Sequence, residues 1–155
     1  MRELNIVGVI SDTHGLLRPQ AVAALAGCNC ILHAGDIGQQ EVLAGLRAIA
    51  PVVAVRGNVD FGWAKALPET TLVDIAGRRI LLLHNLAEIE IDPRAAGLDV
   101  VIAGHSHRPE IETRDGVLYV NPGSAGPRRF TLPIAVAQIE ITDRGVEARI
   151  IELSV

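Results

Sequence analysis

The sequence VVIAGHSH at residues 100–107 joins a short apolar run to a glycine and two of the five histidines of the chain. The apolar run is typical of a buried strand. Because residues two apart in an extended chain point the same way, His105 and His107 can face one spot beyond the strand end, as the ligands of a metal site do. The alternative is a polar loop whose imidazoles bind only backbone groups, since histidine has many roles besides metal binding.

Four other apolar runs end in residues of the same chemical kind. We predict buried strands at residues 6–10, 30–33, 52–55 and 80–83. The polar side chains that follow these runs are Asp12, His14, Asp36, Asn58 and His84. In open α/β sheets the ligand site lies beyond the carboxyl ends of the strands, so all seven side chains are candidates for one pocket. A polar-loop interpretation has to explain each residue separately, and we therefore favour a metal site.

Composition and charge restrict the classes of protein that fit. The 155 residues, 49% of them hydrophobic, suit a single domain over residues 1–155 that buries about 70% of the surface of its unfolded chain. The net charge of −4 and the single lysine, Lys65, argue against binding along a nucleic-acid backbone. The apolar run near the N-terminus is too short for a secretory or membrane-spanning segment, so we expect a cytoplasmic protein without membrane contact.

Helices and hairpins complete the predicted fold, which is of the α/β (α+β) class. Apolar spacing and capping residues predict helices at residues 20–26, 39–50 and 92–97. Turn residues predict hairpins at residues 76–77, 115–116 and 142–145. Cys28 and Cys30 are the only cysteines, and we expect buried thiols because a structural zinc site would need further ligands nearby.

The donor atoms of the seven candidates indicate two metal ions rather than one. Seven ligands are too many for one tetrahedral ion, but they suit two ions that share a bridging carboxylate. Nitrogen and oxygen donors without a thiolate favour manganese, iron, zinc, cobalt or nickel. Two divalent ions offset by two aspartates leave a charge of about +2, which attracts an anionic substrate even to an acidic protein. Phosphate esters fit this charge.

The polar motifs occur in an order that resembles the five blocks of the calcineurin-like metallophosphoesterases. These motifs are Asp12-Thr13-His14, Gly35-Asp36, Gly57-Asn58, His84 and GHSH at residues 104–107. The sequences RGNVD at residues 56–60 and NPGS at residues 121–124 resemble, more narrowly, the small bacterial and archaeal phosphodiesterases of the YfcE/MJ0936 type. The resemblance extends from about residue 6 to residue 128. It implies a four-layer αββα sandwich with two mixed β-sheets and a dinuclear metal centre.

The same resemblance implies a ligand set and an activity. One metal would take Asp12, His14, Asp36 and His107, and the other would take Asp36, Asn58, His84 and His105. A metal-bridging hydroxide would attack phosphorus in line, so that Asp36, Asn58 and His105 act catalytically through the metals. Mn²⁺ is the expected ion, with Fe, Zn, Co or Ni as alternatives. The implied activity is that of a phosphodiesterase on a small phosphate ester, with phosphomonoesters as a second substrate class.

Two positions depart from the family pattern. Val59 stands where larger members carry a histidine that assists the leaving group, so we expect diesters with good leaving groups to react faster than alkyl monoesters. Asn85 stands where the family usually has glycine, and it can add a polar contact to substrate. Arg56 and Asp60 are further candidate substrate contacts, although Arg56 can equally pair with a local carboxylate. The segment between Asp60 and His84 is short, which predicts an open site.

Two other functions are compatible with the same fold. A Vps29-like protein-interaction scaffold would carry an altered metal site, whereas the ligand set here is complete. A nuclease would need more positive charge than this chain has. Homo-oligomerisation is compatible with either function. The fifth histidine, His33, is expected to form hydrogen bonds within the core rather than to bind metal.

Overall fold

Parallel strands at the centre of the first sheet come from the apolar runs of the N-terminal half. The computed structural model describes residues 4–155, and its first sheet has the order β10-β9-β1-β2-β3. The bounds are β1 (Asn5–Ile10), β2 (Cys30–His33), β3 (Val52–Ala54), β9 (Ala135–Thr142) and β10 (Gly145–Glu152). β1, β2 and β3 are parallel, while β9 pairs antiparallel with β1. The carboxyl ends of the three parallel strands therefore meet at one edge.

The second sheet repeats this plan with the later apolar runs. Its order is β4-β5-β6-β8-β7. The bounds are β4 (Thr70–Ile75), β5 (Arg78–Leu83), β6 (Val100–Ile102), β7 (Glu110–Arg114) and β8 (Val117–Asn121). β5, β6 and β8 are parallel, and the hairpin partners β4 and β7 are antiparallel edges. Both sheets are thus mixed, as the resemblance implied.

The main core lies between the two sheets. Val7 and Val9 of β1 pack there with Leu82 of β5 and Ile102 of β6, and all four are fully buried. Alternate residues of a strand face opposite sides, so Ile10 points instead to the outer core beneath the helices. Because β1 is covered on both faces, its sequence is a continuous apolar run rather than an alternating one.

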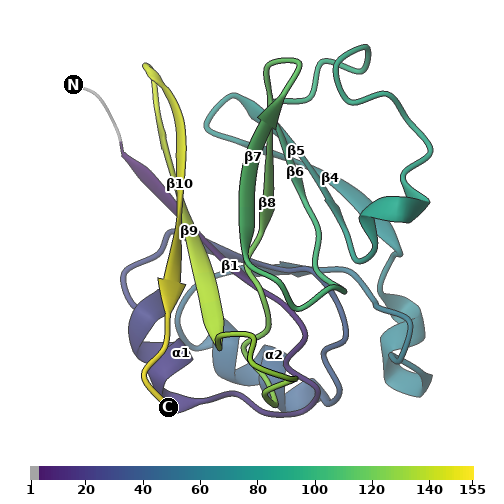
Figure 1. Cartoon of the computed structure of the whole chain (residues 1–155), viewed down its shortest axis with the longest axis vertical. Coiled ribbons are helices and arrows are strands. Elements are labelled where there is room, and N and C mark those ends of the chain that lie inside the picture. Colours follow the sequence, from purple (N-terminus) through teal and green to yellow (C-terminus); the bar gives the residue numbers. More distant parts are fainter. Residues whose placement is uncertain (1–3) are drawn as a thin grey trace.

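Both α-helices of residues 4–155 cover the first sheet. α1 (Pro19–Leu25) contacts β9 and α2 (Gln40–Arg47) contacts β3, both in the first sheet. Figure 1 shows both helices against this sheet, whereas loops surround β4, β5 and β6. Across residues 4–155, the other helical pieces are the 3₁₀ turns η1 (Gly62–Ala66) and η2 (Leu86–Glu88). The outer layer over the second sheet is therefore made of a 3₁₀ turn and loop rather than an α-helix.

The predicted helix at residues 92–97 is wrong. This segment is a hydrogen-bonded turn, in which the Ala96 amide donates to the Asp92 carbonyl at 2.9 Å. Pro93 and Gly97 leave too few residues between them to repay the cost of nucleating a helix. The three predicted hairpins are present, and Ala76-Gly77 and Asp115-Gly116 both have two positive φ angles, as type I′ turns require. In residues 4–155, no helix is long and apolar enough to cross a bilayer.

Candidate metal centre

The strand ends of both sheets supply one cluster of polar side chains. Asp12 and His14 follow β1, Asp36 follows β2, and His84 directly follows β5. The loop after β6 brings in His105 and His107. Backbone hydrogen bonds join these segments, from Asp12 N to Gly35 O at 3.0 Å and from Gly104 N to His84 O at 2.9 Å. Strand ends far apart in sequence are thus fixed next to one another.

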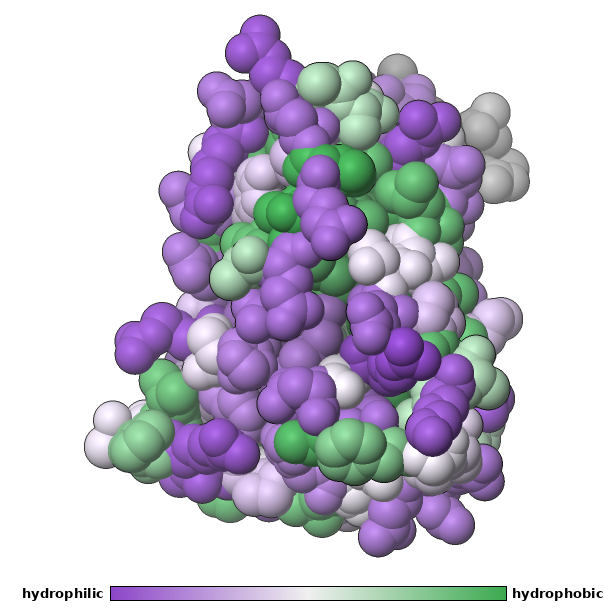
Figure 2. Space-filling model, turned by 90° about the vertical axis from the view of Figure 1, so that its right-hand side faces the viewer, coloured by the Kyte–Doolittle hydropathy of each residue, from purple (hydrophilic) through white to green (hydrophobic). Residues whose placement is uncertain are grey.

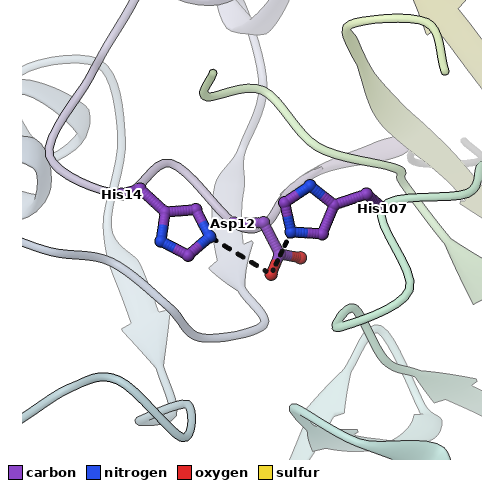
Figure 3. Close-up of side chains that lie close together, drawn as sticks. All are labelled: Asp12, His14 and His107. Carbon is purple, nitrogen blue, oxygen red and sulfur yellow. Dashed lines mark ion pairs between the residues drawn. The ribbon is translucent and has the colours of Figure 1, made fainter. Parts of the chain in front are cut away.

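Asp12, His14 and His107 form the first ligand group of the cluster. Asp12 Oδ1 lies 3.4 Å from His107 Nε2 and 3.9 Å from His14 Nε2. Figure 3 shows both imidazoles pointing at this oxygen. One donor atom from each residue lies within 4.8 Å of the others, a spacing that allows a shared metal ion. The first group therefore unites residues from the ends of β1 and β6.

Asp36, His84 and His105 form the second ligand group. His84 Nε2 lies 3.1 Å from Asp36 Oδ2 and 3.3 Å from His105 Nδ1. His84 Nδ1 donates to the carbonyl of Ala34 at 2.7 Å, which leaves Nε2 as the ligand atom. Metal-binding histidines are commonly oriented by such a hydrogen bond. The exposed Asn58 borders a cleft beside His84.

Asp36 lies between the two groups. Its Oδ2 is 3.1 Å from His84 Nε2 in the second group and 3.9 Å from His14 Nε2 in the first. Its Oδ1 accepts the Val59 amide at 3.1 Å, so one oxygen is held by the protein and the other faces the cluster. This position is the one that a bridging carboxylate would need.

Unpartnered buried atoms test whether metal ions fit. Among residues 4–155, Asp12 Oδ1 and His14 Nε2 are buried and have no hydrogen-bond partner. A buried polar atom without a partner costs about 1–3 kcal/mol, so such atoms are rare without a reason. Both atoms point into the cluster, and both are donors of the kind that divalent cations bind. The residues present therefore fit a metal centre.

Backbone strain marks the same residues. Asp12, His14, Asp36, His105 and His107 all have positive φ, between 47° and 72°. Left-handed backbone at residues other than glycine costs about 1–3 kcal/mol and concentrates at functional sites. Glycines allow the close approach that follows, because a Cβ at Gly104 would collide with Ser11 and Asp12. The backbone at the cluster thus adopts unfavourable conformations that bring these side chains together.

The charges of the cluster suit metal binding near neutral pH. Burial opposes ionisation of Asp12 and Asp36, but contacts with His107 at Asp12 and with His84 at Asp36 hold both pKa values below the ordinary range. Burial lowers the pKa of His14, which keeps that imidazole neutral. Burial also disfavours the charged form of His84, but Asp36 outweighs it and raises the pKa of His84. A metal ion must therefore displace a proton from His84 at mildly acidic pH.

Asp60 is not placed to contact substrate, contrary to the sequence prediction. Its side chain is buried and accepts backbone amides of Ile37 at 2.9 Å, Gly38 at 3.1 Å and Gly57 at 2.8 Å. Because Asp36 in turn accepts the Val59 amide, the loops after β2 and β3 hold each other through two carboxylates. We call this arrangement, formed by Asp36 and Asp60, the loop clasp. Asp60 acts on the centre by positioning those loops.

Arg56 and Asn85 border the cleft but have local partners. Arg56 donates to the carbonyls of Lys65 and Leu67, both at 3.1 Å, and pairs with Glu69 at 2.9 Å. The local-carboxylate alternative for Arg56 is therefore confirmed. Asn85 Oδ1 accepts the Ala87 amide at 3.1 Å and caps η2.

Several residues that support the centre were not predicted from sequence to do so. Asn121 donates to Gly104 O and Ser106 Oγ, each at 3.0 Å, and so holds the GHSH loop. Ser124 Oγ donates to the Asp12 carbonyl at 3.0 Å. Both belong to the NPGS motif, whose place between two hairpins gave no sign of contact with the centre.

His33 lies in the core, as predicted. Its Nδ1 accepts the Gly35 amide at 3.1 Å, so Nε2 donates to Thr13 Oγ1 at 3.0 Å, and Thr13 donates to Ile37 O at 2.8 Å. Complete burial lowers the pKa of His33 to about 4. This neutral imidazole links the loops that carry Asp12 and Asp36.

Comparison with known families agrees with the cluster. Residues 6–144 match the calcineurin-like phosphoesterase superfamily domain. The chain belongs to this superfamily. A probable metallophosphoesterase of Methanothermobacter thermautotrophicus is 35% identical over 94% of this chain and 91% of its own length. The phosphodiesterase MJ0936 of Methanocaldococcus jannaschii is 28% identical over 76% of this chain and 82% of its own length. This member of the superfamily is accordingly a hydrolase of phosphate esters that uses divalent metal ions.

Solved structures share the fold. A structure described as a novel archaeal phosphodiesterase aligns with a TM-score of 0.80 at 26% identity, covering 96% of this chain and 99% of that one. Vacuolar Protein Sorting 29 of Cryptosporidium parvum aligns with a TM-score of 0.77 at 21% identity, covering 98% of this chain and 99% of that one. The second likeness concerns the fold alone.

Proposed function

We propose that this chain is a metal-dependent phosphodiesterase with a dinuclear centre. One ion would be held by Asp12, His14 and His107. The other would be held by His84, Asn58 and His105, and Asp36 would bind both ions. The observation that supports this most is the convergence of two ligand groups on Asp36, whose free oxygen is 3.1 Å from His84 Nε2 and 3.9 Å from His14 Nε2. Nitrogen and oxygen donors suit manganese, iron, zinc, cobalt or nickel, and Mn²⁺ is the ion we expect among them.

The metals supply activation of water and neutralise charge on phosphoryl oxygens when bound. The protein holds the donor atoms in place, through Ala34 at His84 and through Val59 at Asp36. Two aspartates offset only part of the charge of two divalent ions, so the site favours an anionic group. A phosphodiester brings one negative charge and two ester arms.

Since each histidine already has another role, we expect the site to favour diesters with good leaving groups. All five histidines of the chain have a place, four in the two ligand groups and His33 in the core. Val59 is 43% exposed, and by resemblance it stands where larger family members carry a histidine that assists the leaving group. Leaving groups that depart without a proton are therefore expected to react fastest. Alkyl phosphomonoesters reacting faster than aryl diesters at neutral pH would contradict this preference.

A scaffold function is the second candidate, because Vacuolar Protein Sorting 29 has the same fold. The complete ligand set favours an enzyme over that scaffold. A nuclease is disfavoured by the net charge of −4. A cytoplasmic location and homo-oligomerisation remain predictions from the sequence.

One experiment separates enzyme from scaffold. Bound Mn²⁺ is counted after dialysis, and hydrolysis of bis(p-nitrophenyl) phosphate is measured for the parent, His105→Ala and Arg108→Ala. Arg108 is an exposed neighbour outside the ligand groups, so its variant is the matched control. We expect two ions and activity in the parent and the control, and a loss of about 100-fold or more in His105→Ala. Full metal occupancy without activity on mono- or diesters would support the scaffold instead.

A further inference from the structure

Two clefts open beside the second ligand group, and both border the η2 turn. The larger has a volume of about 860 Å³ and the smaller about 220 Å³. Ala87 and Glu88 of η2 line the larger cleft, and Leu86 lines the smaller. The face that carries β4, η1 and η2 has apolar surface in its upper half framed by hydrophilic residues (Figure 2). This face is open because no α-helix covers the second sheet in residues 4–155.

The smaller cleft suits a compact apolar group. Val101 and Ala103 contribute to its lining from β6 and the loop that follows, and Tyr119 contributes from β8. The Arg114 guanidinium lies over the Tyr119 ring, 4.7 Å from its centroid, and Glu112 holds it at 2.8 Å. An aromatic ring beside aliphatic side chains, in a space of about 220 Å³, matches an aryl or short alkyl group.

The larger cleft has a different character. Arg56 is paired with Glu69, while Glu88 and Glu90 add two more carboxylates to its lining. Thr70 and Leu83 complete one wall. The acidic lining disfavours a polyanionic group, because like charges in a cleft repel. A neutral polar group such as a nucleoside fits both the volume and this charge.

The two clefts meet at the metal centre. His84 lines the larger cleft and His105 lines the smaller, and their ring nitrogens are 3.3 Å apart. Asn85 lines both. A phosphoryl group held at this contact can therefore send one ester arm into each cleft. A phosphomonoester has only one arm and would leave one of the clefts empty.

We propose that the substrate is a phosphodiester with two unlike arms, a compact aryl or alkyl arm beside Tyr119 and a larger, uncharged polar arm between β4 and η2. This assignment rests on the proposed phosphodiesterase function. Tyr119 and Ala87 are the positions that separate the two arms, because each lines one cleft and neither belongs to a ligand group.

Crossed kinetics test the assignment. The Mn²⁺-loaded parent, Tyr119→Ala, Tyr119→Phe and Ala87→Trp are assayed with methyl p-nitrophenyl phosphate and with the p-nitrophenyl ester of thymidine 5′-phosphate. Tyr119→Ala should raise KM at least tenfold for both esters, and Tyr119→Phe should restore it because the ring is retained. Ala87→Trp fills the larger cleft from an exposed position and should raise KM only for the thymidine ester.

Equal effects of Ala87→Trp on both esters, or unchanged KM in Tyr119→Ala, would overturn the cleft assignment while leaving the phosphodiesterase function in place. An inactive parent on both esters would overturn the proposed function instead. Saturation-transfer NMR on the metal-free proteins, with the phenyl ester of thymidine 5′-phosphate, gives a readout without catalysis. We expect the phenyl protons to receive saturation in the parent and to lose it in Tyr119→Ala, and equal transfer in both proteins would contradict the assignment.

Discussion

The two ligand groups differ in what holds them. In the first group, Asp12 Oδ1 and His14 Nε2 are buried without hydrogen-bond partners among residues 4–155, so a bound cation would satisfy them. In the second group, the Ala34 carbonyl and the Val59 amide already orient His84 and Asp36. The second group also carries the exposed His105 and opens onto both clefts, whereas neither cleft is lined by a residue of the first. We therefore expect the first group to depend on a bound ion for its stability, and the second group to be preorganised for substrate.

Removing Asp36 should have the largest effect, because its carboxylate lies between the two groups, 3.1 Å from His84 Nε2 and 3.9 Å from His14 Nε2. We expect Asp36→Ala to lose both ions and at least about 1,000-fold in kcat/KM, or about 4 kcal/mol of transition-state stabilisation. Metal analysis and diester hydrolysis measure the two losses. Glu147→Ala, on the exposed face of β10, is the control. Retention of one tightly bound ion in Asp36→Ala would show that the groups are independent rather than joined.

His33 connects the loops that carry Asp12 and Asp36, and its protonation provides a test of that connection. Its pKa is about 4 when folded and 6.5 in the unfolded chain. Only the unfolded state binds the proton between these values, so stability is complete above pH 6.5 and falls as the pH drops toward 4. The loss amounts to about 3 kcal/mol. Metal-free parent and His33→Gln are unfolded in urea from pH 7 to pH 4.5, and parallel pH profiles would contradict this role.

Metal removal compares the two groups directly. An ion at about 100 times its dissociation constant stabilises the folded state by about 2.7 kcal/mol. EDTA should therefore lower the free energy of unfolding of the parent by about this amount for each ion that it removes. We expect His107→Ala to abolish more of this metal-dependent stabilisation than His105→Ala, because the unpartnered buried atoms lie in the first group. Equal losses, measured by urea unfolding with and without Mn²⁺, would remove the distinction.

The sequence predicted that the Asp and His candidates would lie close together, but not what holds them. Five strands ending in Asp, Asn or His were enough to predict one pocket, because parallel strand ends share an edge. The positive φ angles of five candidate ligands had no sequence signal, since Asp and His are also common in ordinary loops. The burial of Asp60 was missed for a related reason. The local sequence around an aspartate near a metal motif does not show whether its carboxylate faces substrate or accepts backbone amides.

The outer layer was the part of the fold least determined by local sequence. Asp92-Pro93 is a sound helix start, and Ala96 and Leu98 pack against apolar residues of the second sheet, yet Gly97 leaves too few residues to complete a helix. The tight hairpins were predictable because Asp115-Gly116 and Ala76-Gly77 accept positive φ within two residues. Short-range backbone chemistry was therefore readable from the sequence, whereas the covering of a sheet depended on packing across the molecule.

The loop clasp provides the smallest expected effect and the finest distinction between the groups. In Asp60→Asn, an amide NH₂ replaces one of the two carboxylate oxygens, which leaves the part-buried amide of Gly38 or Gly57 without its acceptor, while Ile37 keeps one oxygen. We expect a loss of about 1–2 kcal/mol in the free energy of unfolding. Asp115→Asn, in an exposed turn where asparagine also accepts positive φ, is the matched control.

Asp60 holds the loops that carry Asp36 and Asn58, and the hydrogen bonds of its side chain run to backbone amides of those loops rather than to Asp12, His14 or His107, among the residues that the structure describes. Asp60→Asn should therefore weaken one Mn²⁺ site about tenfold and leave the other near its parent affinity. Titration calorimetry resolves the two sites. The coupled EPR signal of a Mn²⁺ pair should also diminish, since it requires both ions. If both sites weaken equally, the clasp supports both ligand groups, and the prediction that the groups respond separately is wrong.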